Sequence, residues 1–286
     1  MSFLLSKLKK LIPSSSKKII RKILEKIKII LRSRTVIKKI DGIIYKLDLR
    51  EFIDYEIYKN GCFEPETTKA IELLSKPGFT IIDIGANSGC HTLRFAKIVG
   101  PNGKVFAFEP MSWAFKKLKE NVSLNKFKNI ILEQKALSNK KENNVSVNFS
   151  CSWPINTNSK KLHPIHKGKI MEDKSDFITL DEYLEKNKVG KINLIKLDVD
   201  GFELKILKGT LKTIKTSHPI IILEIGRYTL KEQGDYPEDL VDLLLKENYQ
   251  VCNESNLKPF SNRSALINSI PDKKTINVIA LPLNLK

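Results

Sequence analysis

The stretch at residues 79–89, FTIIDIGANSG, constrains the fold most, because it places a tight glycine-containing turn between a strand and a helix. The β-branched run at 80–84 predicts a buried strand, and apolar residues at helical spacing predict a helix over 90–99. Gly85 and Gly89 let the backbone turn sharply and approach a ligand that a Cβ atom would exclude. Parallel sheets bind nucleosides at such junctions, next to the unpaired N–H groups of the helix.

Two acids near this turn indicate which nucleoside it binds. Glu109 lies twenty residues after Gly89, at the tip of the next predicted strand, where its carboxylate can accept hydrogen bonds from two ribose hydroxyls. A dinucleotide site requires the pattern GxGxxG, whereas three residues separate Gly85 from Gly89 here, which disfavours a nicotinamide-dependent oxidoreductase. Asp83 would repel a pyrophosphate but would pair with the cationic sulfonium and amino groups of S-adenosylmethionine. We therefore interpret the turn as a methyl-donor site.

Strand and helix patterns alternate along the chain, which predicts an α/β fold with a parallel sheet. Strands are expected at 80–84, 104–108, 129–133, 192–197, 219–223, 249–252 and 275–281, with an extra strand at 145–149. Helices are expected at 65–75, 90–99, 113–125, 202–211 and 237–246, with a short helix from residue 181. Residues 150–175 carry no periodicity and predict a long loop, which in a compact domain is usually functional or disordered.

Two further acids follow the buried strand at 192–197. Asp198 and Asp200 are expected at its carboxyl end, where ligands bind in open α/β sheets, so they are candidates for chemistry. A local interpretation competes for the second acid: Asp200 could cap the following helix, and Glu203 could stabilise the first helical turn through the macrodipole. For Asp198 we favour the functional role.

Five motifs in order resemble the FkbM-type family of S-adenosylmethionine-dependent methyltransferases over residues 60–285. They are DIGANSG from Asp83, FEP from Phe108, ALS from Ala136, LDEYL from Leu180 and IKLDVDGFELKILKG from Ile195. The resemblance implies a Rossmann-like, seven-stranded class I methyltransferase sheet whose last strand is antiparallel. It also implies O-methylation of a sugar hydroxyl in a glycan, glycolipid or natural product. This chain has Asp200 where the family more often has Glu, which shortens the carboxylate but keeps its charge.

The same resemblance assigns roles in the site. The methionine and ribose portions of S-adenosylmethionine would be lined by Asp83, Gly85, Ala86, Asn87 and Gly89, the ribose hydroxyls bound by Glu109, and the adenine flanked by Ala136 and Leu137. A neutral sugar hydroxyl is a poor nucleophile, so a base or a metal must take or depress its proton. Asp198 is the first candidate, acting directly or through a divalent ion held together with Glu224. Asp200 follows as a candidate base, and His166 and His91 are weaker candidates.

The charge is concentrated at the N-terminus. The net charge is +18, and residues 1–40 contain thirteen Lys or Arg against one acid, Glu25. Isoleucines and leucines at 19–31 recur at helical intervals, which predicts a basic amphipathic helix over 17–32, and residues 36–49 predict a β-hairpin. We expect a helical and hairpin extension at 1–50 and a methyltransferase domain at 51–286. Residues 1–34 would contact an anionic membrane surface, a partner groove or the protein's own body.

The remaining composition narrows the function. The four cysteines are far apart without a CxxC pair, so neither a zinc site nor a disulfide framework is expected. No apolar run is long enough to cross a bilayer and the N-terminus is a poor signal peptide, so we expect a cytoplasmic protein. Methylation of RNA or another small molecule is the alternative activity. An RNA or DNA amino-methyltransferase normally carries an Asp/Asn-Pro-Pro-Tyr/Phe turn where this chain has DVDG, so we expect a carbohydrate-containing acceptor and no specific nucleic acid.

Overall fold

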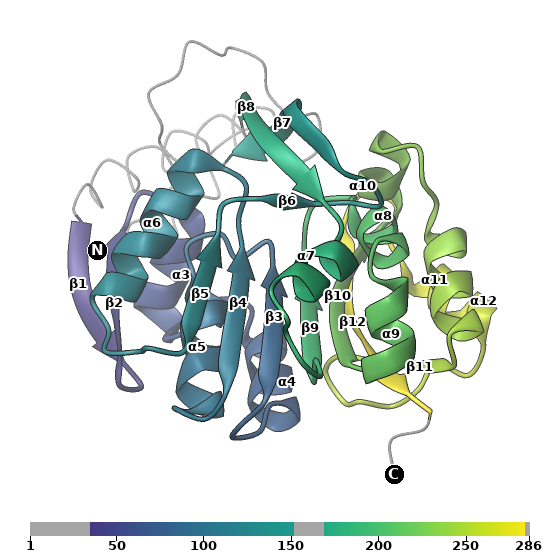
Figure 1. Cartoon of the computed structure of the whole chain (residues 1–286), viewed down its shortest axis with the longest axis horizontal. Helices are drawn as coiled ribbons and strands as arrows, with labels where there is room; N and C mark the ends of the chain where they lie inside the picture. Colours follow the sequence, from purple (N-terminus) through teal and green to yellow (C-terminus); the bar gives the residue numbers. More distant parts are fainter. Residues whose placement is uncertain (1–34, 152–168, 284–286) are drawn as a thin grey trace, which may run out of the picture.

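The computed structural model describes residues 35–151 and 169–283 of the chain. Its centre is a seven-stranded sheet in the order β11-β12-β10-β9-β3-β4-β5 (Figure 1). Neighbouring strands from β10 to β5 are parallel, whereas β12 runs antiparallel to both β10 and β11. This topology confirms the predicted class I methyltransferase sheet with its antiparallel last strand. The strands are β3 (Thr80–Ile84), β4 (Lys104–Phe108), β5 (Ile130–Glu133), β9 (Leu194–Leu197), β10 (Ile220–Gly226), β11 (Tyr249–Asn253) and β12 (Thr275–Pro282).

Helices cover both faces of this sheet, because successive strand residues point to opposite sides. Ile81 belongs to one buried cluster with Ile71 of α4 and Phe95 of α5. Ile82 belongs to the cluster on the other face, which is completed by α7 to α12 and includes Leu207 of α8. The helices are α3 (Phe52–Asn60), α4 (Pro65–Leu74), α5 (Cys90–Val99), α6 (Ser112–Ser123), α7 (Leu180–Lys186), α8 (Glu203–Lys208), α9 (Leu211–Ser217), α10 (Arg227–Glu232), α11 (Pro237–Lys246) and α12 (Arg263–Ser269).

A small second sheet lies beyond the arrowheads of the central strands (Figure 1). It consists of β6 (Ala136–Leu137), β7 (Glu142–Cys151) and β8 (Lys169–Ile178), with β8 parallel to β6 and antiparallel to β7. The loop predicted at 150–175 is therefore wrong at 150–151, which belong to β7, and from Lys169 onward. The sequence KIMEDKSD at 169–176 lacks a continuous apolar face, and its strand conformation comes from pairing with β7.

The helix predicted at 202–211 is also wrong as a single helix, because α8 ends at Lys208 and α9 begins at Leu211. Gly209 lies in the break. A Cβ atom on Gly209 would come within 2.1 Å of the carbonyl oxygen of Ser138. The helix is therefore interrupted where the residue after α8 packs directly on the backbone that follows β6.

The N-terminal hairpin is confirmed, with β1 (Thr35–Ile40) antiparallel to β2 (Ile43–Asp48). The inward residues of β2 pack with Ile57 of α3 and Leu93 of α5. The amphipathic helix predicted at 17–32 lies outside the described residues, and the boundary at residue 50 stays a prediction. None of the helices in the described ranges is long and apolar enough to cross a membrane.

Candidate functional site

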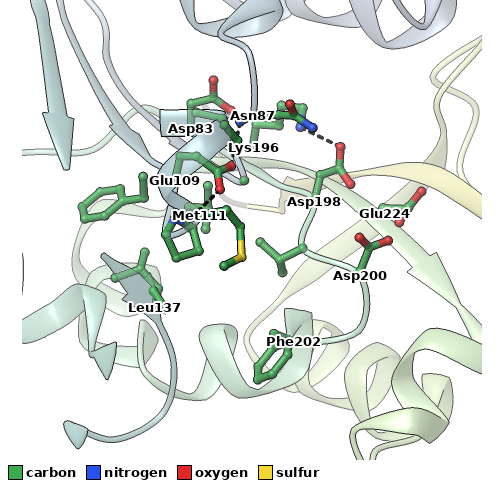
Figure 2. Close-up of a pocket in the computed structure, with 18 of the residues that line it drawn as sticks. Asp83, Asn87, Glu109, Met111, Leu137, Lys196, Asp198, Asp200, Phe202 and Glu224 are labelled. Atoms are coloured by element: carbon green, nitrogen blue, oxygen red, sulfur yellow. Dashed lines mark hydrogen bonds and ion pairs between the residues drawn. The ribbon is translucent and has the colours of Figure 1, made fainter. Parts of the chain in front are cut away.

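The carboxyl ends of β3, β4, β9 and β10 open into a cavity of about 980 Å³ (Figure 2). Ligand sites for small molecules typically enclose roughly 300–1,000 Å³, so the cavity is large enough for a cofactor. Ten predicted site residues line it: Asp83, Gly85, Ala86, Asn87, Glu109, Ala136, Leu137, Asp198, Asp200 and Glu224. Gly89 is not part of this lining, and His166 lies outside the described residues.

The turn after β3 passes against the end of β9 at van der Waals distance. Gly85 has φ +78°, and a Cβ atom there would lie 1.9 Å from the carbonyl oxygen of Asp198. The N–H groups of Gly85 and Ala86 both donate to the carbonyl of Phe108 at 3.0 Å, which ties the turn to β4 as well. Gly89, with φ +86°, packs on Leu118 and starts α5. Only glycine satisfies both the left-handed backbone and the close approach at residue 85.

The side chain of Glu109 hydrogen-bonds to the backbone of this turn and to that of the loop after β4. Its Oε2 accepts a hydrogen bond from the N–H of Asn87 at 2.9 Å, and its Oε1 accepts one from the N–H of Met111 at 2.8 Å. Burial raises the pKa of Glu109 to about 7, although the two N–H donors favour the ionised form. Each oxygen keeps a second lone pair. The carboxylate lines the cavity with acceptor capacity left, and its role as the ribose ligand stays a prediction.

The side chains deep in the turn fit a cationic amino-acid moiety. Asp83 is fully buried, and its Oδ2 accepts a hydrogen bond from the Oγ1 of Thr92 at 2.5 Å. Asp83 Oδ1 and Asn87 Oδ1 are buried and accept no hydrogen bond from any described residue. Buried oxygens without a donor are costly, and a ligand with N–H groups or positive charge would satisfy them. The residues present therefore fit S-adenosylmethionine.

Asp198 is paired with a buried lysine that the sequence analysis did not identify. Lys196 Nζ lies 2.9 Å from Asp198 Oδ2, with the lysine side chain 4% exposed and the carboxylate 32% exposed (Figure 2). Burial alone would lower the pKa of Lys196, but the nearby carboxylates of Asp198, Asp83 and Glu64 outweigh burial and raise the pKa above its usual range. The ammonium group therefore keeps its charge and holds one oxygen of Asp198.

The side chain of Glu203 hydrogen-bonds to the backbone of the loop from Asp198 to Gly201. Its Oε1 accepts hydrogen bonds from the N–H groups of Val199 and Gly201, both at 3.1 Å. Asp200 adopts a left-handed φ of 49° and lines the cavity, and the N-cap residue of α8 is Phe202. The cap interpretation of Asp200 stays a prediction, and Glu203 is a positioning residue for the loop that carries both acids.

Glu224 ends this acidic side of the cavity, with Asp198 and Asp200 near it in Figure 2. Its Oε1 accepts a hydrogen bond from the Oγ1 of Thr275 at 2.5 Å. Burial and the neighbouring Asp198 and Asp200 raise the pKa of Glu224 well above its ordinary value. In the described residues, no three or more His, Cys, Asp and Glu side chains are grouped so that they could hold a metal ion. The metal role of Asp198 and Glu224 stays a prediction.

His91 also lines the cavity, beside Glu64. Its Nε2 is 3.6 Å from Glu64 Oε2, and its side chain is 7% exposed. Burial works to lower the pKa of His91, but Cys90 and the Glu64 carboxylate outweigh it and raise the pKa to about 10. An imidazolium that keeps its proton at neutral pH is a poor general base, which argues against the weaker candidate role of His91.

Sequence reasoning therefore missed Lys196 and Glu64. A signal for Lys196 exists in the sequence, since residues two apart on a strand share a face and Lys196 is two before Asp198. Glu64 has no comparable signal, because it reaches the cavity from the start of α4, more than a hundred residues away in the chain from β9.

Comparisons with known proteins identify the family of this chain. Residues 83–251, more than half of the chain, match the model of the methyltransferase FkbM domain, and residues 10–136 match that of protein-L-isoaspartate(D-aspartate) O-methyltransferase. Hexuronic acid methyltransferase AglP of Haloferax volcanii is 33% identical over 162 residues, covering 57% of this chain and 59% of that protein. Methyltransferase 1 of Beauveria bassiana is 28% identical over 176 residues, covering 56% of this chain and 66% of that protein.

The chain thus spans about three-fifths to two-thirds of the length of these two relatives. A crystal structure of a methyltransferase FkbM from Methylobacillus flagellatus superposes with a TM-score of 0.43 at 15% identity, covering 74% of this chain and 50% of that one. The family match includes the turn at residues 83–89, called the donor turn below, and the DVDG loop at 198–201. It excludes the oxidoreductase alternative. The chain belongs to the FkbM family of S-adenosylmethionine-dependent methyltransferases.

Proposed function

We propose that this protein transfers the methyl group of S-adenosylmethionine to a hydroxyl group of a sugar in a glycan, glycolipid or natural product. The observation that carries the proposal is the partly exposed carboxylate of Asp198 at the donor turn, fixed by a buried ammonium group. The hexuronic acid methyltransferase of Haloferax volcanii, a relative with a sugar acceptor in its name, supports the choice of a carbohydrate.

The residues divide the cavity into a donor side and an acceptor side. Glu109 would bind the ribose, Leu137 would contact the adenine, and Asp83 would face the positive charge near the sulfur. When bound, the cofactor supplies a methyl group on a positively charged sulfur, which leaves as a neutral thioether. Asp198 and Asp200 lie on the remaining side, so an acceptor hydroxyl enters there.

Asp198 is the proposed general base. One of its oxygens receives the ion pair from Lys196, and the carboxylate is exposed enough to reach a hydroxyl group in the cavity. The acceptor proton passes to Asp198 and then to water, while the ammonium group of Lys196 keeps the carboxylate in place. General-base assistance of this kind is typically worth about 100-fold or more in rate.

The test uses the purified full chain, radiolabelled S-adenosylmethionine and a panel of methyl glycosides of hexoses and hexuronic acids, with bulk RNA as the competing acceptor. We expect methyl transfer to a sugar. Asp198→Asn is expected to lower turnover at least about 100-fold and to change the affinity for S-adenosylhomocysteine by less than about threefold, because an amide accepts no proton. Asp239→Asn, an exposed substitution on α11, is the matched control.

Three results would contradict the proposal. Label in RNA but in no sugar would favour the alternative acceptor. Full turnover in a folded Asp198→Asn enzyme would move the base elsewhere, first to Asp200. Loss of wild-type turnover on adding a chelator would favour the version in which a divalent ion acts with Asp198, since a direct base is indifferent to chelation.

A further inference from the structure

A second cavity of about 610 Å³ adjoins the donor cavity. The two cavities share four lining residues, so they meet at a common wall rather than lying on separate faces of the protein. The shared residues are Phe177, Phe202, Glu232 and Gln233. The second cavity therefore lies next to the first.

One residue of this wall, Phe202, lies in the same short segment as the proposed base. Phe202 follows the loop that carries Asp198 and Asp200, and its ring centroid lies 6.0 Å from that of Phe177 in β8. Glu203, the next residue, fixes that loop through the N–H groups of Val199 and Gly201. Hydrogen bonds within one short segment thus position Phe202 relative to the proposed base.

The lining of the second cavity has the chemistry of a sugar site. Apart from the shared residues, it offers hydroxyl, amide, ammonium and carboxylate groups with a single aliphatic side chain: Ser138, Asn139, Lys140, Glu142, Val145, Ser146 and Lys205. Two ammonium groups balance the carboxylates of Glu142 and Glu232, so the cavity favours no strong net charge. Convergent neutral and balanced polar groups beside an aromatic ring suit a polyhydroxylated ring with apolar C–H faces.

Lys205 is positioned to donate a hydrogen bond to a sugar ring bound in this cavity. Its Nζ donates a hydrogen bond to the carbonyl of Gln233 at 2.9 Å and lies 5.2 Å from the centroid of the Phe202 ring. An ammonium group has three donors, so Lys205 keeps donors for a ligand hydroxyl. Lys205 lines the second cavity and is not part of the lining of the first.

One close backbone contact connects two segments that contribute to the lining of this cavity. Gly209, just after α8, approaches the carbonyl of Ser138 so closely that a Cβ atom would lie 2.1 Å from it. This contact joins the segment bearing Lys205 to the segment bearing Asn139. The contact therefore fixes the distance between these two segments.

We propose that the second cavity is an acceptor subsite, which binds the sugar unit next to the one that receives the methyl group. The inference rests on the proposed function and restricts the class of acceptor. The acceptor is an oligosaccharide or glycan chain, and a free monosaccharide is a poor substrate because it leaves this subsite empty.

The experiment compares two acceptors that share the reacting sugar: the best methyl glycoside from the panel above and the disaccharide that carries one further sugar. For the wild type, the disaccharide is expected to have a KM about tenfold lower than that of the methyl glycoside, at similar kcat. One or two hydrogen bonds to a charged group typically change affinity by about this factor. Lys205→Ala and Asn139→Ala are expected to raise the KM of the disaccharide toward that of the methyl glycoside. Neither substitution is expected to change the KM of the methyl glycoside.

Lys208→Ala is the matched control, because Lys208 is exposed on the same helix and lines neither cavity. Affinity for S-adenosylhomocysteine, measured by calorimetry, verifies the donor site in every variant. Equal KM for the two acceptors in the wild type, or a KM raised equally for both by Lys205→Ala, would overturn the subsite alone. Normal donor binding without methylation of any sugar would instead overturn the proposed function, and the subsite with it.

Discussion

The contact between Gly85 and the carbonyl oxygen of Asp198 gives the sharpest test of the site, through the substitution Gly85→Ala. A methyl group would stand 1.9 Å from that oxygen, whereas ordinary contact begins near 3.4 Å. The obstacle is backbone, which cannot rotate aside as a side chain can. The donor turn and the strand end that bears Asp198 must therefore separate.

Gly78→Ala is a matched control. Gly78 has φ +81°, close to the +78° of Gly85, but a Cβ atom there would have no neighbour within 4 Å. The left-handed backbone alone costs an alanine about 1–2 kcal/mol, so both variants carry that loss. Overpacking adds about 1–3 kcal/mol at residue 85 only. For a domain of this size the extra loss lowers Tm by a further ~2–12 °C.

Function should respond more strongly than stability. Misplacing reacting groups by about 1 Å can cost roughly 100-fold in rate, so Gly85→Ala is expected to lose at least about 100-fold in turnover. We also expect at least about tenfold weaker binding of S-adenosylhomocysteine, since the turn must move within the donor site. Thermal unfolding and calorimetry on both variants measure these effects. If Gly85→Ala matches Gly78→Ala in Tm and in donor affinity, the packing argument is refuted.

Three further predictions follow from other parts of the chain. Because the pKa of Glu109 is about 7, donor affinity should rise from pH 6 to pH 8 as the carboxylate ionises. Glu109→Gln should weaken binding about tenfold or more and remove this dependence, and calorimetry showing a flat wild-type profile would contradict the assignment. Lys117→Ala removes the cation 2.6 Å from the fully buried carboxylate of Asp54, so urea unfolding should show a loss of about 3–5 kcal/mol, with exposed Lys119→Ala as control. A chain beginning at Thr35 should bind S-adenosylhomocysteine normally but no longer sediment with anionic vesicles; if the full chain ignores such vesicles, residues 1–34 have another role.

Local patterns predicted the parts of the site that are built from consecutive residues. Gly85, Glu109 and Asp198 each follow a short β-branched or apolar run, and the carboxyl ends of parallel strands meet at one edge of a sheet. Hydrophobic periodicity was equally informative for α5 and α11, whose bounds agree with the prediction. In these places the residue's own neighbours in the chain decide its position.

Prediction failed where a distant segment decides the local structure. The break between α8 and α9 occurs where Gly209 meets the carbonyl of Ser138, seventy-one residues earlier, and a helical pattern at 202–211 carries no trace of that contact. The strand β8 is likewise defined by its pairing with β7 and not by an apolar face. Glu64 enters the cavity from α4, so only the tertiary fold brings it near Lys196.

The arrangement around Lys196 explains why such a distant carboxylate belongs to the site. The buried cations of Lys196 and His91 lie among the three carboxylates of Asp198, Asp83 and Glu64, which leaves an excess of negative charge beside the turn at residues 83–89. Buried like charges repel one another, so this arrangement costs stability in the free protein. A cationic ligand relieves the repulsion, and the energy stored in the site then contributes to donor binding. A neutral thioether relieves less of it, so the same charges favour release of the product after each methyl transfer.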